Sequence, residues 1–190
     1  MTNKIIADIR KGWGKTSSYL IAIVASLFAN FAFAATWYVT LDAHNADYGE
    51  AGETASGNSW SEAITLTNAV AKAQSGDTIL VEGGTYDMTK YAGAVAVTLP
   101  ITIKGGMLRG AEGETVDTVN PYSTFDCKNT IAQAFSVTAA TSAEDWNVFE
   151  RCVFTRGKTR GFYKSGATSL KMIGCKFTHC YPIGRIESFL

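Results

Sequence analysis

Cysteine side chains give this chain its most direct route to covalent or metal chemistry. Cys127, Cys152 and Cys175 follow one another at nearly equal spacing, and Cys180 comes shortly afterwards. A zinc site is not expected, because no C-x-x-C pair occurs and the two histidines, His44 and His179, are far apart in the sequence. The near-regular spacing instead predicts thiols stacked in a buried row. It also permits a disulfide between Cys152 and Cys175, so the oxidation state of the cysteines stays open.

Acidic side chains gather in residues 42–59, a stretch rich in Gly, Asn, Asp and Ser that is expected to form a loop. Its carboxylates belong to Asp42, Asp47, Glu50 and Glu53, and carboxylate oxygens are ligands that calcium prefers. The ligand spacing of an EF-hand is absent, so the prediction is a solvated loop.

Nucleophilic and phosphate-binding motifs are not apparent. No Ser/His/Asp or Cys/His set stands out, and Gly83-Gly84 and Gly105-Gly106 lack the spacing of a dinucleotide or phosphate loop. These glycines are expected at chain corners. Four aromatic residues could stack on sugar rings, although packing within a cap or core is the expected role: Trp60, Trp146, Tyr163 and Tyr181.

A repeat indicates how these groups are positioned. Phe149, Cys152 and Phe154 recur with the same mutual spacing as Met172, Cys175 and Phe177. A period of roughly 20–30 residues that restores apolar residues to the same places is typical of a chain that coils over itself. Each coil buries its apolar face on its neighbour, so the pattern predicts a stacked β architecture.

Residues 1–34 form a separate segment. A basic leader with Lys4, Arg10, Lys11 and Lys15 precedes an apolar run at 19–33 that ends in Ala-Phe-Ala. This pattern predicts a secretory signal peptide, and the run is short for a membrane span, the alternative interpretation. Of the 17 basic and 17 acidic residues, four bases and one acid fall in this segment, so the remainder has a net charge of −3. That charge indicates no nucleic-acid surface.

The rest of the chain is predicted to form one helix followed by strands. Leu66, Ala69, Val70 and Ala73 form one apolar stripe with helical spacing, with Ser59 or Ser61 as its expected N-cap and Gly76 beyond its end. Short apolar segments broken by glycine follow, including 78–81, 95–103, 125–127, 135–137, 148–154 and 170–177, with a tight turn at 83–86 and links at 138–145 and 157–166. The prediction is a parallel β-helix whose first coil is capped by the helix.

Residues 37–88 resemble the N-terminal cap of secreted right-handed parallel β-helix proteins, both pectate-lyase-like proteins and adhesins of the polymorphic outer-membrane-protein type. The matching motifs are Tyr38-Val39, Ser59-Trp60, Gly76-Asp77-Thr78-Ile79, Gly84-Thr85-Tyr86, Ile101–Gly106, Thr124-Phe125-Asp126 and the two C-x-F segments at Cys152 and Cys175. The chain departs from the pattern where Arg151 and Gly174 replace the usual Asn before C-x-F, and where Cys127 replaces a Gly. The resemblance implies the fold and does not by itself imply an activity.

Polysaccharide lyases of this type hold calcium with acidic residues on neighbouring coils and use an Arg or Lys as base. The resemblance would make Asp126 and Glu150 the ligands and Arg151, Arg156 or Lys176 the base. Alignment of the coils on Cys127 and Cys152 places Asp126 level with Arg151. A stacked carboxylate pair is therefore not expected, and these charges are predicted to lie on solvated outer faces.

We therefore expect an all-β chain: a signal peptide (1–34), an N-terminal cap with the first coils (35–106), and further coils (107–190) that stop short of the length of relatives. The expected function is that of an exported surface or extracellular protein, adhesin-like or carbohydrate-contacting and non-catalytic, with no catalytic residue, metal or cofactor. Its expected partner is a polysaccharide or host-cell-surface ligand, without nucleic acid and without a transmembrane segment after cleavage. The alternatives are the N-terminal part of a calcium-dependent polysaccharide lyase, or a truncated gene product without independent function.

Overall fold

The computed structural model describes residues 34–45, 55–91, 93–111, 113–138, 145–165 and 169–180. Contacts divide the chain into two units, Met1–Phe33 and Ala34–Leu190. The predicted signal peptide lies outside the described residues except for Ala34, so it stays a prediction. Within the described ranges, no helix is both long enough and apolar enough to span a membrane.

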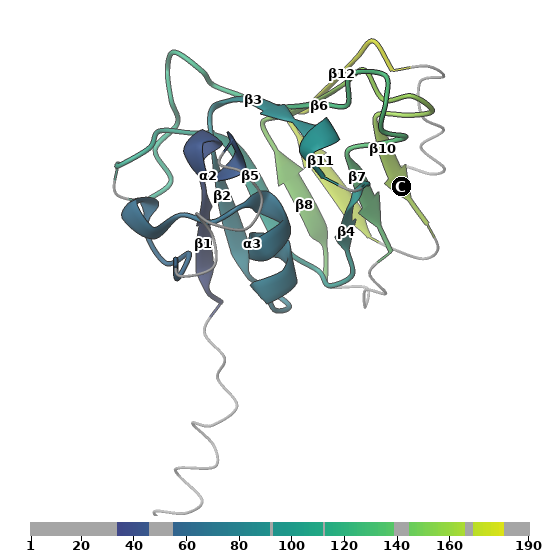
Figure 1. The fold of residues 1–190 in the computed structure, drawn as a ribbon. Coiled ribbons are helices and arrows are strands. Elements are labelled where there is room, and N and C mark those ends of the chain that lie inside the picture. The colour runs from purple at the N-terminus through teal and green to yellow at the C-terminus, as the bar shows by residue number, and fades with distance from the viewer. Residues whose placement is uncertain are drawn as a thin grey trace, which may run out of the picture. The chain divides into compact units, whose positions relative to one another are not determined.

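Twelve strands in the described part of the chain form three sheets in which neighbouring strands run parallel (Figure 1). Sheet A contains β1 (Thr36–Val39), β2 (Thr78–Glu82), β5 (Thr102–Met107), β8 (Asn147–Glu150) and β11 (Leu170–Ile173). Sheet B contains β3 (Gly84–Asp87), β6 (Ser123–Asp126), β9 (Cys152–Thr155) and β12 (Lys176–Thr178). Sheet C contains β4 (Val95–Val97), β7 (Phe135–Val137) and β10 (Phe162–Lys164). This arrangement confirms the prediction of a mostly β chain with little helix.

The chain visits the three sheets in a fixed order. From β2 it runs through β3 and β4, and the next passages are β5–β6–β7 and β8–β9–β10, followed by β11 and β12. Parallel strands cannot be joined by a hairpin, so each return to a sheet requires a full crossover. Here the crossover is made by the strands of the other two sheets.

The register confirms the sequence repeat at the end of the described chain. Phe149 lies opposite Met172 and Phe154 opposite Phe177, and the rings of Phe154 and Phe177 stack with centroids 5.1 Å apart. One passage earlier the offset is different, because Phe125 lies opposite Phe154. The links between strands differ in length, so the period is not constant along the chain.

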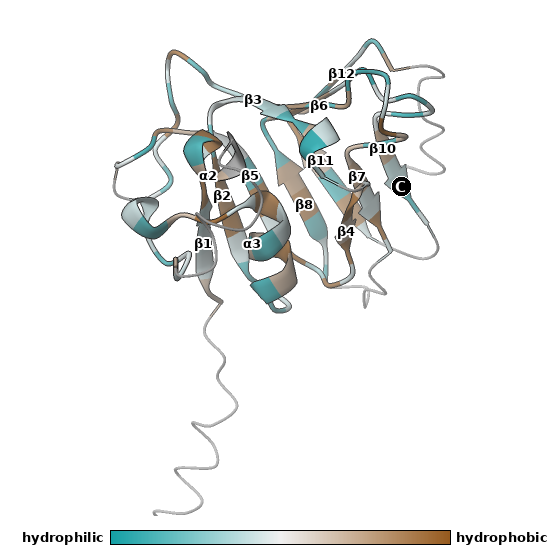
Figure 2. Cartoon of the chain, in the orientation of Figure 1, coloured by the Kyte–Doolittle hydropathy of each residue, from teal (hydrophilic) through white to brown (hydrophobic). Residues whose placement is uncertain are grey.

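The main core lies between the inward faces of the three sheets. Its aromatic centre consists of five phenylalanines at most 8% exposed: Phe125, Phe135, Phe149, Phe154 and Phe162. Inward and outward residues alternate along the strands, as in β9, where Cys152 and Phe154 are buried and Val153 and Thr155 are half-buried. Figure 2 shows the resulting mixture of apolar and polar residues along single strands.

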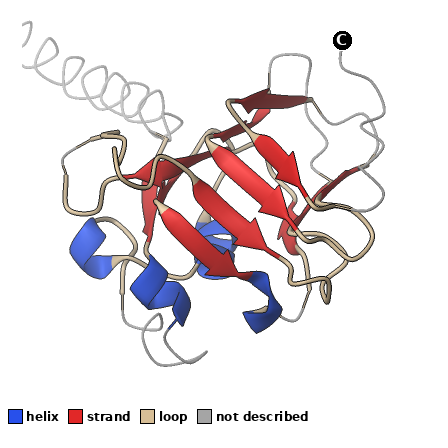
Figure 3. Cartoon of the chain, turned by 90° about the horizontal axis from the view of Figure 1, so that it is seen from above, coloured by secondary structure: helices blue, strands red, loops and turns tan. Residues whose placement is uncertain are grey.

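The predicted helix is α3 (Leu66–Lys72), which buries Leu66 and Ala69. Its N-cap is Thr65, whose hydroxyl accepts a hydrogen bond from the Asn68 amide at 3.3 Å, so the prediction of Ser59 or Ser61 is wrong. The helix ends at Lys72 with Ala73 as its C-cap, so Gly76 is not the residue that directly follows the C-cap, as was predicted. The two serines instead belong to a separate 3₁₀ turn, η1 (Trp60–Glu62), and its N-cap. Figure 3 shows the short helical segments beside the strands.

Three other local predictions need correction. The stretch expected to be a loop begins with a helix, α2 (Leu41–Asn45). Residues 84–86, expected in a tight turn, belong to β3, and the link expected at 157–166 contains β10. A second 3₁₀ turn, η2 (Met88–Lys90), follows β3. Elements this short have little intrinsic preference in their own sequence, so their conformation depends on packing against neighbouring strands.

Candidate functional site

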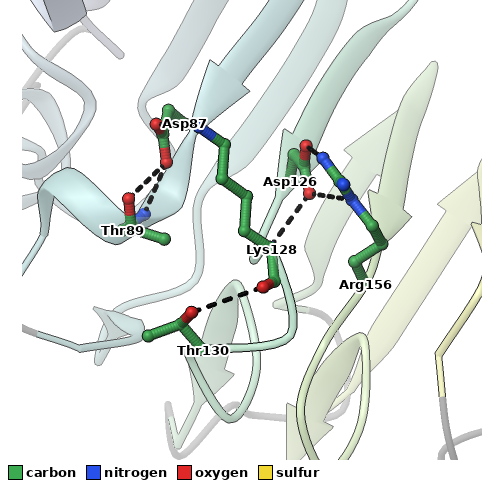
Figure 4. A network of polar contacts seen from close by, with 6 residues as sticks. All are labelled: Asp87, Thr89, Asp126, Lys128, Thr130 and Arg156. Carbon is green, nitrogen blue, oxygen red and sulfur yellow. Dashed lines mark hydrogen bonds and ion pairs between the residues drawn. The ribbon is translucent and has the colours of Figure 1, made fainter.

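Four charged residues meet where the strands of sheet B end, and we call this set the charged corner: Asp87, Asp126, Lys128 and Arg156 (Figure 4). Asp87 closes β3 and Asp126 closes β6, and the two are directly paired in the parallel register. Lys128 and Arg156 follow the ends of β6 and β9 with left-handed φ values of 48° and 51°. The backbone turns sharply at these positions, which brings the two cations beside the two carboxylates.

Asp126 is bound by Arg156 and is only 5% exposed. The Arg156 Nε donates to Asp126 Oδ1 at 2.7 Å and Nη2 contacts Oδ2, while the Lys128 amide donates to Oδ1 at 3.0 Å. Burial raises the pKa of the Asp126 carboxyl, but these hydrogen bonds outweigh burial and the pKa is lowered. The same contact raises the pKa of Arg156, which makes its guanidinium a poorer base.

Asp87 is held in a similar way by the neighbouring lysine. The Lys128 ammonium donates to Asp87 Oδ2 at 2.5 Å, and the hydroxyl and amide of Thr89 donate to Oδ1 at 2.6 and 3.0 Å. Burial raises the pKa of Asp87, but these donors outweigh burial and lower it from 3.8 to about 2. Both carboxylates of the charged corner are therefore ionised and paired over a wide pH range.

The alignment that placed Asp126 level with Arg151 is wrong. Asp126 lies opposite Thr155, because Ser123 and not Cys127 is the partner of Cys152. A stacked carboxylate pair does exist, formed by Asp126 with Asp87. Asp126 also does not lie on a solvated face. The sequence contains the signal in Thr-Tyr-Asp at 85–87 and Thr-Phe-Asp at 124–126, which are the same motif one coil apart.

The other residues of the predicted lyase site do not join the charged corner. Glu150 ends β8 in sheet A, where its carboxylate contacts the guanidinium of Arg151. Arg151 Nε also donates to the Gly105 carbonyl at 3.1 Å. Lys176 lies on β12 with its ammonium 3.9 Å from the centre of the Tyr122 ring. Each of these cations is therefore engaged by a different partner.

Arg151 and Gly174, which replace the usual Asn of the resembling family, occupy a second corner between sheets A and B. Their φ values are 50° and 60°, and Gly106 in the preceding passage has a φ of 69°. Asn and Gly adopt this left-handed conformation most readily. These positions therefore have the left-handed backbone that Asn and Gly favour, although neither of them carries an Asn side chain.

In the described part of the acidic stretch at residues 42–59, the Asp42 carboxylate forms an ion pair with Arg109. Asp47, Glu50 and Glu53 lie outside the described residues. In the parts of the chain that are described, no group of three or more His, Cys, Asp or Glu side chains is placed to hold a metal.

The aromatic candidates have different environments. Trp60 packs against Leu80 and Met107 and donates to the Ala111 carbonyl at 3.0 Å, as expected for packing. Trp146 is 43% exposed, and Tyr163 on sheet C carries the Arg160 guanidinium 4.5 Å above its ring. Tyr181 lies outside the described residues.

A groove borders the outer face of sheet B at its β3 end. It has a volume of about 200 Å³ and is lined by Gly84, Thr85 and Thr124 together with residues 119–122. Thr85 and Thr124 are paired in register, and the row continues through Val153 to Lys176. Tyr122 was not among the aromatic candidates, because nothing in its local sequence distinguishes it.

The four cysteines are free thiols in the structure. The expected row is correct only in part. Cys152 in β9 is level with Cys175, which directly precedes β12, because each lies one residue before the paired Val153 and Lys176. Cys127 is not level with Cys152, since its amide bonds to the Thr155 carbonyl at 3.0 Å.

Comparison of the chain with protein-family models, with curated proteins and with solved structures gives no match.

Proposed function

We propose that the chain forms a right-handed parallel β-helix and acts as an exported, non-catalytic protein that contacts carbohydrate through the groove beside sheet B. The proposed fold is supported by three parallel sheets visited in constant order. Connections between parallel strands of one sheet are right-handed in about 98% of cases. The position of α3 against β1, β2 and β4 at the first passage supports its role as a cap.

The groove is the observation that carries the proposed activity. Thr85 and Thr124 offer hydroxyl groups, Asn120 offers an amide, and Tyr122 offers a ring beside them. Sugars are bound by this combination, because hydroxyl and amide groups exchange hydrogen bonds with the sugar hydroxyls while an aromatic ring covers an apolar sugar face. The Lys176 ammonium over Tyr122 fixes one side of the ring.

A non-catalytic role is supported by the state of the candidate bases. Arg156 is bound to Asp126, Arg151 contacts Glu150, and Lys176 covers Tyr122. A general base must give up its proton and reach the substrate. The Asp126 contact raises the pKa of Arg156, which opposes the first requirement.

A matched pair of tyrosines tests the proposed contact. Tyr122 and Tyr163 each lie beneath a cation, but only Tyr122 lines the groove. The experiment measures binding to a panel of neutral and uronate polysaccharides for the full wild-type chain and for its Y122A and Y163A variants. We expect Y122A to weaken binding roughly tenfold, equivalent to about 1.4 kcal/mol, and Y163A to leave it unchanged. Equal loss in both variants, or binding to no polysaccharide, contradicts the proposal.

One observation favours the lyase alternative. Asp87 and Asp126 are acids on neighbouring coils with Arg156 beside them, which is the arrangement that the resemblance to lyases implies. Calcium would have to displace Lys128 and Arg156 from the carboxylates. Release of unsaturated uronate from pectate, with and without calcium, tests this alternative. Calcium-dependent release that D126A abolishes would replace the proposed function with the lyase, and absence of release in both conditions would support the binding role.

A further inference from the structure

Cys152, the first residue of β9, and Cys175, which directly precedes β12, occupy matched positions beside each other. Val153 lies opposite Lys176 and Phe154 opposite Phe177, so the two cysteines that precede these pairs are level. Adjacent strands are about 4.8 Å apart, and disulfides join Cα atoms separated by roughly 4.4–6.8 Å. Their thiols also share one region, since Cys152 Sγ donates to the Glu150 carbonyl and Cys175 Sγ to the Phe149 carbonyl, each at 3.3 Å.

The two thiols differ in access and reactivity. Cys152 is fully buried, and burial raises its pKa. Cys175 is only partly buried and immediately precedes β12, one of the two end strands of sheet B among the described residues. Contact with the Cys152 thiol lowers the pKa of Cys175. An accessible thiolate attacks a disulfide faster than a buried thiol does, so Cys175 has the character of an attacking thiol and Cys152 that of a resolving thiol.

We propose that Cys152 and Cys175 form a reversible disulfide between neighbouring strands, by exchange with a small external disulfide such as glutathione disulfide. The Cys175 thiolate attacks one sulfur of the external disulfide and releases one thiolate, which leaves a mixed disulfide. Cys152 then attacks the Cys175 sulfur, and its proton passes to the second departing thiolate. Two protein thiols are oxidised, and one external disulfide is reduced to two thiols. This proposal does not depend on carbohydrate binding.

The other two cysteines provide an internal comparison. Burial raises the pKa of Cys127 to about 12, so its thiol is unreactive at neutral pH. Cys180 is 8% exposed and its Sγ lies 3.5 Å from the Phe154 carbonyl. Neither cysteine is level with a second cysteine in the paired strands. The exchange should therefore select one pair among the four.

Peptide mapping of the full wild-type chain tests the selection. Trypsin places each cysteine in a separate peptide: 110–128, 152–156, 172–176 and 177–185. The native protein is incubated with glutathione disulfide, its remaining thiols are alkylated, and the digest is analysed by mass spectrometry. We expect the thiols of Cys152 and Cys175 to be lost in equal amounts, with peptides 152–156 and 172–176 appearing as one linked species. Reduction should restore both thiols.

Two single variants separate the attacking thiol from the resolving thiol. In C152S the mixed disulfide of glutathione with Cys175 should persist, whereas in C175S the buried Cys152 should keep its thiol. The wild-type map does not require either variant to fold. No loss of thiols, a linked pair other than Cys152 and Cys175, or a persistent mixed disulfide in the wild-type chain overturns the proposal.

Discussion

Replacement of Phe154 by alanine should cause a large loss of stability. The Phe154 side chain is fully buried, and its ring lies 5.1 to 6.1 Å from five other rings, those of Phe125, Phe135, Phe149, Phe162 and Phe177. Buried Phe→Ala substitutions cost about 3–5 kcal/mol, because apolar contact is lost and a cavity remains. With this many ring contacts we expect a loss of about 4 kcal/mol, a large share of the roughly 5–15 kcal/mol that stabilises a typical domain.

The adjacent residue is the matched control, because a shift of one residue would exchange the inward and outward faces of β9. Val153 points outward and is half-buried, so V153A should cost less than about 1 kcal/mol. Urea unfolding of the full chain, followed by circular dichroism, gives both free energies. A loss in V153A equal to or greater than that in F154A would refute the assigned faces of the strand.

Three further predictions concern charge, backbone and packing. The lowered pKa values of Asp87 and Asp126 stabilise the fold above their unfolded values near 3.8, and this stability is lost as pH falls toward about 2. Because Lys128 is 48% exposed, we expect its pairing with Asp87 to contribute only about 1 kcal/mol to the free energy of unfolding. In D87N this contribution should disappear from the pH dependence of urea unfolding between pH 4 and pH 2. An unchanged pH profile would contradict the pairing. G106A should cost more than about 2 kcal/mol, since φ is 69° and a Cβ would lie 2.2 Å from the Pro121 carbonyl oxygen. G76A has a φ of 89° but open space around the added Cβ, so it should cost only about 1–2 kcal/mol in thermal unfolding. Equal losses would contradict the close approach of Gly106 to Pro121. W60F should cost about 1 kcal/mol through the lost hydrogen bond to Ala111, and no change in the melting temperature would contradict that contact.

Much of the β architecture could be predicted from the sequence because apolar residues repeat at fixed places. Phe154 and Phe177 belong to matching C-x-F segments, and the links between them are short enough to preserve the period. The helix could be recognised because its apolar stripe has helical spacing. Its N-cap was missed because several hydroxyl residues precede the stripe. Ser59 and Thr65 both have an extended backbone, but only Thr65 directly precedes the helix and accepts the capping hydrogen bond from the Asn68 amide.

The charged corner was missed because the register of its strands depends on the lengths of the links, and the alignment was made on the wrong motif. Alignment on the cysteines joined Cys127 to Cys152, but the longer path between β6 and β9 places Ser123 opposite Cys152. The pairing of Asp87 with Asp126 follows from the repeated Thr-aromatic-Asp motif, which is weaker than a cysteine signal. The groove depends on residues 119–122, which lie in a link without periodicity.

The most direct test of the stacked arrangement is a nuclear Overhauser measurement on selectively labelled phenylalanines. The structure places the Phe154 ring between those of Phe125, one passage earlier, and Phe177, one passage later. Ring protons of Phe154 should therefore show cross-peaks to both rings, with the stronger one to Phe177 at 5.1 Å between centroids. Cross-peaks from Phe154 to neither ring would contradict the stacking of successive passages.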